Sequence, residues 1–135
     1  MLAFEEQLYI KLNGGTALIA LLGGTEIYNS LGARGSANTY PFVIFTKSSG
    51  IDENISPKRA KTFVYQVTGI SNKSKKEAEQ IDDACDELVH NISFASIAAW
   101  GNYWCMRESD ISYVEEVSGR VLWHEGGLYR VRLAQ

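Results

Sequence analysis

The chain has 135 residues, of which 45% are hydrophobic and 21% charged, and its net charge is -3. This composition is typical of a globular protein and argues against disordered, fibrous and collagen-like classes. An acidic chain has no general attraction to nucleic acid or to anionic membranes, so we expect neither as a partner. Because one hydrophobic core suffices for this length and no repeat is visible, we expect residues 1–135 to form a single domain.

The two cysteines and the N-terminal residues indicate the compartment. Neither Cys85 nor Cys105 belongs to a C-x-x-C pair, so we expect buried, reduced thiols and no zinc or redox site. The chain lacks a basic and apolar leader, and no window approaches the roughly eighteen apolar residues of a transmembrane helix. We therefore expect a protein that is made and used in a cytoplasm.

The N-terminal segment predicts two short helices and a strand. Residues 2–12 fit an amphipathic helix that Asn13-Gly14 would end. Thr16 is expected to cap a second helix over residues 17–22, which stops at the glycine pair that follows. Glu26-Ile27-Tyr28 is typical of a short strand.

Two further strands are expected to form a hairpin with a long tip. Residues 41–46 contain the apolar run Phe42-Val43-Ile44-Phe45, which predicts a central strand. Residues 61–68 are rich in β-branched and aromatic side chains and predict its partner. Residues 47–61 between them are polar, so we assign them to the tip.

The best-defined element is a long helix from Ser74 to His90. Ser74-Lys75-Lys76-Glu77 matches a capping box, in which Ser74 and Glu77 are expected to satisfy each other's backbone N–H groups. Apolar side chains then recur every three or four residues, and we expect this stripe to pack on a sheet: Ala78, Ile81, Cys85, Leu88 and Ile92. His90 is expected to interact with the helix dipole.

The C-terminal third predicts only strands. Residues 103–106, 111–114 and 128–133 each have strand character, and Gly126-Gly127 suggests a bulge or a tight bend. The strands surround one long helix without regular β-α-β alternation. The sequence therefore predicts the α+β class, with a mostly antiparallel sheet. The long helix from Ser74 to His90 and a short N-terminal helix are expected to pack on one face of this sheet.

The sequence contains no recognisable constellation of catalytic or metal-binding residues. Gly32-Ala33-Arg34-Gly35-Ser36 lacks the Gly-Lys-Ser/Thr end of a phosphate-binding loop. Cys105 with His124 or His90 would be a nucleophilic pair. Cys105 has apolar neighbours in the sequence, however, and burial among apolar groups raises the pKa of a thiol and keeps it in the unreactive protonated form. The acidic residues of the long helix are expected to be solvated: Asp82, Asp83, Asp86 and Glu87. We assign no catalytic, cofactor-binding or metal-binding residue.

Charged and aromatic side chains point instead to protein–protein contacts. The polar tip supplies the candidate assembly residues Lys47, Asp52, Glu53, Lys58, Arg59 and Lys61. Aromatic residues gather in the last third, and a domain of this size rarely buries every one of them. The candidate interface aromatics are Trp100, Trp104 and Trp123. No aromatic residue interleaves with the basic ones, as binding of single-stranded nucleic acid would require.

The order of these segments resembles the tail completion, or tail terminator, proteins of long-tailed bacteriophages and prophages, which join head and tail. The likeness spans nearly the whole chain and rests on residues 17–24, Ile27-Tyr28, Tyr40-Pro41-Phe42-Val43-Ile44, residues 63–67, the helix 74–90 and residues 127–133. The chain departs from the family between Asn29 and Thr39, which is rich in Gly, Ser and Ala where the family tends to carry proline.

The resemblance implies a structural virion protein with no enzymatic activity and no cofactor. Such a subunit forms a hexameric ring at the head-proximal end of the tail tube, stops tube growth and joins the tail to the head connector. Its partners would be further copies of itself, the tail tube protein and the connector protein, and it would assemble in a bacterial cytoplasm. Two alternatives stay open: another neck or minor tail component such as a head-side joining protein, and a small-molecule-binding or hydrolytic domain.

Overall fold

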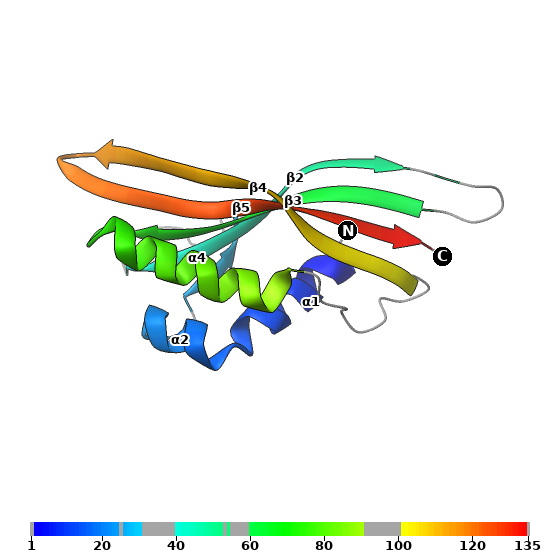
Figure 1. Ribbon diagram of the computed structural model, residues 1–135, viewed down its shortest axis with the longest axis horizontal. Helices are drawn as coiled ribbons and strands as arrows, with labels where there is room; N and C mark the ends of the chain where they lie inside the picture. The colour runs from blue at the N-terminus through cyan, green and yellow to red at the C-terminus, as the bar shows by residue number, and fades with distance from the viewer. Residues whose placement is uncertain are drawn as a thin grey trace.

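The computed structural model describes residues 2–24, 26–30, 40–52, 54, 60–90 and 101–134, with the backbone alone for residues 2, 3 and 101–103. The chain is α+β, as the sequence predicts, with helices on one face of a five-stranded sheet (Figure 1). Its elements are α1 (Leu2–Asn13), α2 (Thr16–Leu22), β1 (Ile27–Asn29), β2 (Phe42–Asp52), β3 (Ala60–Ser71), α4 (Lys75–Val89), β4 (Gly101–Val117) and β5 (Arg120–Ala134).

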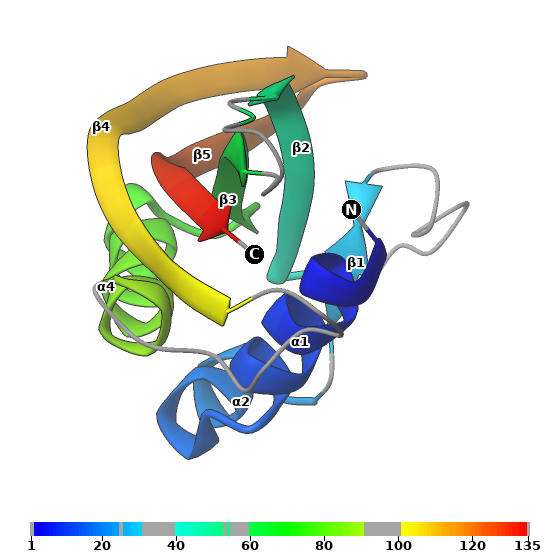
Figure 2. The same ribbon diagram turned by 90° about the vertical axis from the view of Figure 1, so that its right-hand side faces the viewer.

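The strand order is β1-β2-β3-β5-β4, with β1 parallel to β2 and every other pair antiparallel. The apolar residues 42–46 belong to β2, which lies between β1 and β3, so they form a strand inside the sheet as the sequence predicts. The middle strand of the five is β3. The sheet is strongly twisted, and β4 curves around the side of the helical layer (Figure 2).

The β2–β3 hairpin is longer than the sequence predicts. Its register runs from Phe42 opposite Ile70 to Asp52 opposite Lys61, with an irregularity between Lys47 and Ser49. Residues 47–52 are thus strand, although we had assigned them to the tip. The ladder is made by backbone groups, so a polar segment can extend a strand whose side chains face water.

The β4–β5 hairpin corrects a second prediction. Residues 103–106 and 111–114 belong to one strand, because β4 pairs with β5 from Gly101 to Val117 with an irregularity between Arg107 and Ser109. The polar residues at that irregularity made the sequence look like two strands. Ser118 and Gly119 form the turn with positive φ angles of 52° and 78°, as tight hairpin turns require.

Gly126 and Gly127 make neither a bulge in their own strand nor a bend. Both lie inside β5 and are paired on both sides. A Cβ on Gly126 would lie 2.2 Å from the carbonyl oxygen of Val67, and a Cβ on Gly127 would lie 2.7 Å from the guanidinium carbon of Arg107. The glycines are needed because neighbouring groups approach this closely.

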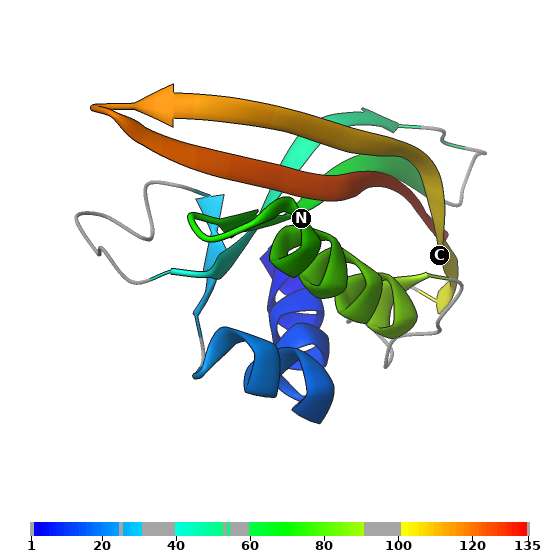
Figure 3. The ribbon, with the colours of Figure 1, turned by 60° about the vertical axis from the view of Figure 1, so that its left-hand side comes forward.

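The main core lies between the sheet and the helices (Figure 3). It contains Phe4, Leu8 and Leu12 of α1, Ile81, Cys85 and Val89 of α4, and strand residues that include Val43, Phe45, Tyr65, Cys105, Tyr129 and Val131. A smaller cluster of Phe42, Ile70 and Leu122 lies on the opposite face. Both cysteines are buried and free, as the sequence predicts.

The start of α4 is held by three side chains and not by a reciprocal capping box. Ser74 accepts the N–H of Glu77 at 3.1 Å, as predicted. The carboxylate of Glu77 instead accepts the hydroxyl of Ser71 at 2.7 Å, and the Ser71 oxygen accepts the N–H groups of Lys73 and Ser74. Ser71 is completely buried at the end of β3, where its hydroxyl lies next to the first turn of α4.

The predicted cap of α2 was wrong by one residue. Gly15 is the N-cap, and Thr16 is the first residue of the helix. A Cβ on residue 15 would lie 2.3 Å from a methyl group of Leu88, so packing against α4 selects glycine there. The C-terminal cap, Gly23, has the left-handed conformation expected of it.

Candidate assembly surfaces

Two segments of the sheet are exposed on both faces. Residues 47–52 of β2 and residues 112–121 of the β4–β5 hairpin are exposed without interruption. Because successive side chains of a strand point to opposite faces, a continuous run of exposed residues means that neither face is covered. The two segments lie at opposite ends of the longest axis (Figure 1). We call them the β2–β3 end and the β4–β5 end.

The β4–β5 end carries apolar side chains in water. Val114 is 60% exposed, and Tyr113, Val117 and Val121 are also largely exposed. Beyond the pair of Ser71 and Trp123 this hairpin has no third strand within the described chain. The sequence analysis missed this end, although the Ser-Gly pair between two apolar runs is a hairpin signal.

The β2–β3 end combines basic groups with an exposed apolar residue. Lys47 lies over the ring of Phe63 at 5.5 Å, and Ile51 is 62% exposed. Lys61 and Asp52 approach to 3.8 Å on the surface, a geometry that contributes little to stability.

The structure places some of the predicted contact residues and not others. Lys47, Asp52 and Lys61 belong to strands, whereas Glu53, Lys58 and Arg59 lie outside the described residues. Of the aromatics, Trp104 is exposed on β4 opposite Arg132, and Trp123 is half-buried on β5 opposite Val114. These two side chains lie at different levels of the hairpin, so they do not form one patch. Trp100 lies outside the described residues.

The outer strand β4 and part of β2 leave backbone groups without a ladder partner in the part of the chain that is described. β4 pairs only with β5. β1 covers β2 only from Val43 to Phe45, so the same edge of β2 is uncovered from Thr46 to Asp52. An open strand edge is a template for pairing with another chain.

Arg107 ties β4 to the helical layer. Its guanidinium donates two hydrogen bonds of 2.9 Å to the carboxylate of Asp82, one to the carbonyl of Gly126 and one to Asp110. The Arg107 and Asp82 side chains are only 17% and 13% exposed. Hydrogen bonding to Asp82 raises the pKa of Arg107, so the guanidinium stays charged. The acidic face of α4, which we expected to be solvated, thus contains a structural ion pair.

Two neighbours complete this network. The hydroxyl of Tyr129 donates to Asp86 at 2.8 Å and accepts from Arg107 at 3.1 Å. Burial is the main cause of the raised pKa of Tyr129, so its hydroxyl stays protonated. His90, which we expected at the helix dipole, caps α4 and accepts the backbone N–H of Arg107 through Nδ1 at 3.0 Å. The backbone N–H of Arg107, at the irregularity of β4, therefore finds its hydrogen-bond acceptor at the C-cap of α4.

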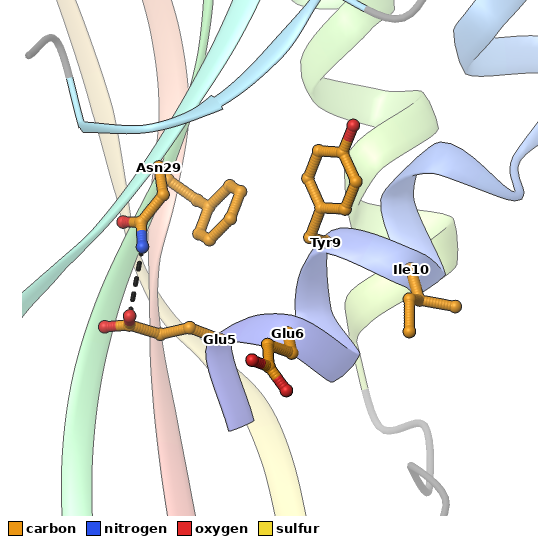
Figure 4. Close-up of a pocket in the computed structure, with 6 residues that line it drawn as sticks. Glu5, Glu6, Tyr9, Ile10 and Asn29 are labelled. Carbon is orange, nitrogen blue, oxygen red and sulfur yellow. Dashed lines mark hydrogen bonds between the residues drawn. The ribbon is translucent and has the colours of Figure 1, made fainter. Parts of the chain in front are cut away.

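A groove of about 390 Å³ lies between α1 and β1 (Figure 4). Tyr9, Ile10 and Phe45 make its lining mostly apolar, and Glu5 crosses it to accept hydrogen bonds from Asn29 at 3.0 Å and from Tyr65 at 3.2 Å. The Glu5 carboxylate is therefore engaged in holding α1 to the sheet. The groove offers apolar contact area and no reactive group.

A second groove, of about 470 Å³, lies on the sheet face opposite the helices. It is lined by apolar residues that include Phe42, Ile70 and Leu122, and it contains His124. The His124 ring stacks on Tyr113 with centroids 4.3 Å apart, and its Nε2 is buried without a hydrogen-bond partner. Burial lowers the pKa of His124 despite Glu115 at 3.8 Å, so the imidazole is neutral at pH 7.

The cysteine–histidine pairs considered from the sequence are not assembled. Cys105 lies in the core beneath the helices, where burial raises its thiol pKa to about 12. His124 lines the groove on the other face, and His90 accepts the N–H of Arg107.

Within the described ranges of the chain, no three or more His, Cys, Asp and Glu side chains converge as a metal site would require. None of the helices found in those ranges has the length and apolar character needed to cross a membrane. Gly32 to Ser36 lie outside these ranges.

The fold is similar to that of a chain in the solved structure of the virion of a native gene transfer agent particle. The TM-score is 0.75 at 14% sequence identity, and the match covers 97% of this chain and 94% of that chain. No protein-family profile and no curated protein sequence matches the chain. At this identity the likeness concerns the fold, which is shared over almost the full length of both chains.

Proposed function

We propose that this chain is a structural protein of a phage-type virion. The observation that carries the proposal is the whole-length fold likeness to a chain of a gene transfer agent virion. It agrees with the resemblance of the segment order to tail completion proteins. The described surface also suits assembly better than catalysis, because its exposed features are two open strand edges and apolar side chains, whereas both thiols are buried.

Within the virion we propose the role of tail completion protein, a subunit of a ring, hexameric as in the family it resembles, at the head-proximal end of the tail tube. Its partners would be copies of itself, the tail tube protein and the head–tail connector. A single asymmetric subunit builds a closed ring through head-to-tail contacts, for which it needs two different complementary surfaces. The two exposed ends of the sheet meet this requirement, since they differ in position and in chemistry.

This role predicts assembly that depends on concentration or on the tail tube. We expect light scattering to give a mass of about six subunits, either for the protein alone or after addition of tail tube protein. A protein that stays monomeric at all concentrations and does not bind the tube would contradict the proposal.

The main alternative is another neck component, such as a head-side joining protein. Copurification distinguishes the two roles. A tail completion protein should be retained by immobilised tail tube protein assembled into tubes, whereas a head-side component should be retained by the portal or connector and pass over the tubes.

A further inference from the structure

We infer that copies of this chain join by adding the end of β4 of one copy to the uncovered edge of β2 of the next. The partner at each edge is thus a second copy of the same chain. This inference deepens the proposed function, on which it rests, by naming the two surfaces of the contact between subunits.

The first support is the position and direction of the two edges. β4 ends at one extremity of the long axis, and the uncovered part of β2 runs to the other (Figure 1). They therefore cannot pair within one chain. Three antiparallel steps separate β2 from β4 in the sheet, so the two strands run in opposite directions. A copy placed end to end in the same orientation would bring them together as an antiparallel ladder.

The second support is charge. Glu115 and Glu116 are exposed at the β4–β5 end, against one basic residue, Arg120. Glu108 and Asp110 of the same strand are already paired with Arg130 and Arg107. Among the described residues of the β2–β3 hairpin, Lys47 and Lys61 lie near this edge, against one acidic residue, Asp52. Opposite charges across a contact steer the partners together and disfavour the like-with-like arrangement. An acidic end therefore prefers the basic end of the next copy over another acidic end.

The third support is apolar surface at both ends. Val114 and Val117 would leave water on one side of the contact and Ile51 on the other. Cross-strand apolar pairs and opposite-charge pairs both stabilise an antiparallel ladder. A pair of joined copies still has one free β4 end and one free β2 edge, so the contact repeats and can close into a ring.

Charge reversal with rescue tests the contact. We expect Lys47→Glu, or Glu115→Lys with Glu116→Lys, to raise the midpoint concentration of assembly at least tenfold in light scattering. Mixing the two reversed proteins should restore assembly to within about threefold, because opposite charges then face each other again. Asp83→Lys with Glu87→Lys, on the exposed face of α4, is the matched control and should assemble as the unchanged protein does.

Hydrogen exchange gives a readout that does not depend on charge. In the assembled state the amides of residues 46–52 and 110–117 should exchange at least tenfold more slowly than in the dilute monomer. Assembly that is insensitive to both reversals and leaves these amides unprotected would overturn the inference while the proposed function stands. Rescued assembly of a protein that ignores tail tubes would support the inference and contradict the proposed function. Failure of the unchanged protein to assemble, both alone and with tail tube protein added, would contradict both.

Discussion

At the scale of single residues, Arg107 is the centre of a hydrogen-bond network that joins three elements of the fold. It lies where β4 is irregular, and its six hydrogen bonds reach α4 and its C-cap, β4 itself and β5. Gly127 is required beside it because a side chain there would displace the guanidinium. The orientation of the β4–β5 end relative to the helices therefore depends on one arginine and the space left for it.

The Arg107 network makes a prediction about stability. Replacing Arg107 by Ala leaves Asp82 buried without its cation, and we expect the free energy of unfolding to fall by about 3 kcal/mol. Arg130, which pairs with Glu108 on the surface of the same hairpin, is the matched control, and Arg130→Ala should cost less than about 1 kcal/mol. Urea unfolding of the two variants measures the difference, and equal losses would contradict this role of Arg107.

His124 makes a prediction about pH. Its pKa is lower in the folded chain than the ordinary 6.5, so below about pH 6.5 the unfolded chain binds the proton first. Stability is therefore lost as the pH falls, by at most about 1.4 kcal/mol per pH unit from this group. In His124→Phe, which keeps an aromatic ring on Tyr113, this component should vanish. Unfolding curves at pH 7.5 and pH 5 test it, and a constant difference between the two proteins would exclude it.

At the scale of elements, the junction of β3 and α4 shows how a cap can be recruited from a neighbouring strand. Ser71, the last residue of β3, accepts the backbone N–H groups of Lys73 and Ser74 in the turn before the helix and donates to the carboxylate of Glu77 in its first turn. Ser74 in turn accepts the N–H of Glu77, as an N-cap residue does. The strand and the helix are thereby joined at a fixed angle.

Ser71→Ala should accordingly destabilise the protein by about 1–2 kcal/mol, because it removes a buried hydroxyl with three hydrogen-bond partners. Lys75→Ala, at the exposed start of the same helix, should change stability by less than about 0.5 kcal/mol. Thermal and urea unfolding report both effects. A loss no larger for Ser71→Ala than for Lys75→Ala would show that Ser71 does not hold this junction.

At the scale of the whole molecule, one core unites the three described helices with all five strands of the sheet. We therefore propose that residues 1–135 form one cooperative domain. In contrast to this core, both ends of the sheet extend beyond the helices and keep their side chains in water. The same chain thus contains a rigid centre and two extensions that are available for assembly.

This division predicts a single unfolding transition for the dilute monomer. The calorimetric enthalpy should equal the van't Hoff enthalpy, as for a two-state domain of this size. Two separated transitions would instead indicate that a hairpin end or the N-terminal helices unfold independently.

The parts that could be predicted from the sequence are those set by local periodicity. The helix after Ser74, the apolar strand residues of β2 and the α+β class follow from spacing and composition, which depend on neighbours along the chain. The lengths of β2 and β4 could not be predicted in this way. Polar residues such as Ser49 and Glu108 join a strand when the backbone of a partner strand lies beside them. The sequence also could not predict that Asp82 pairs with Arg107 or that residue 127 must be glycine. Arg107 reaches both only after the sheet has twisted over α4, and contacts between residues distant along the chain are decided by that tertiary packing.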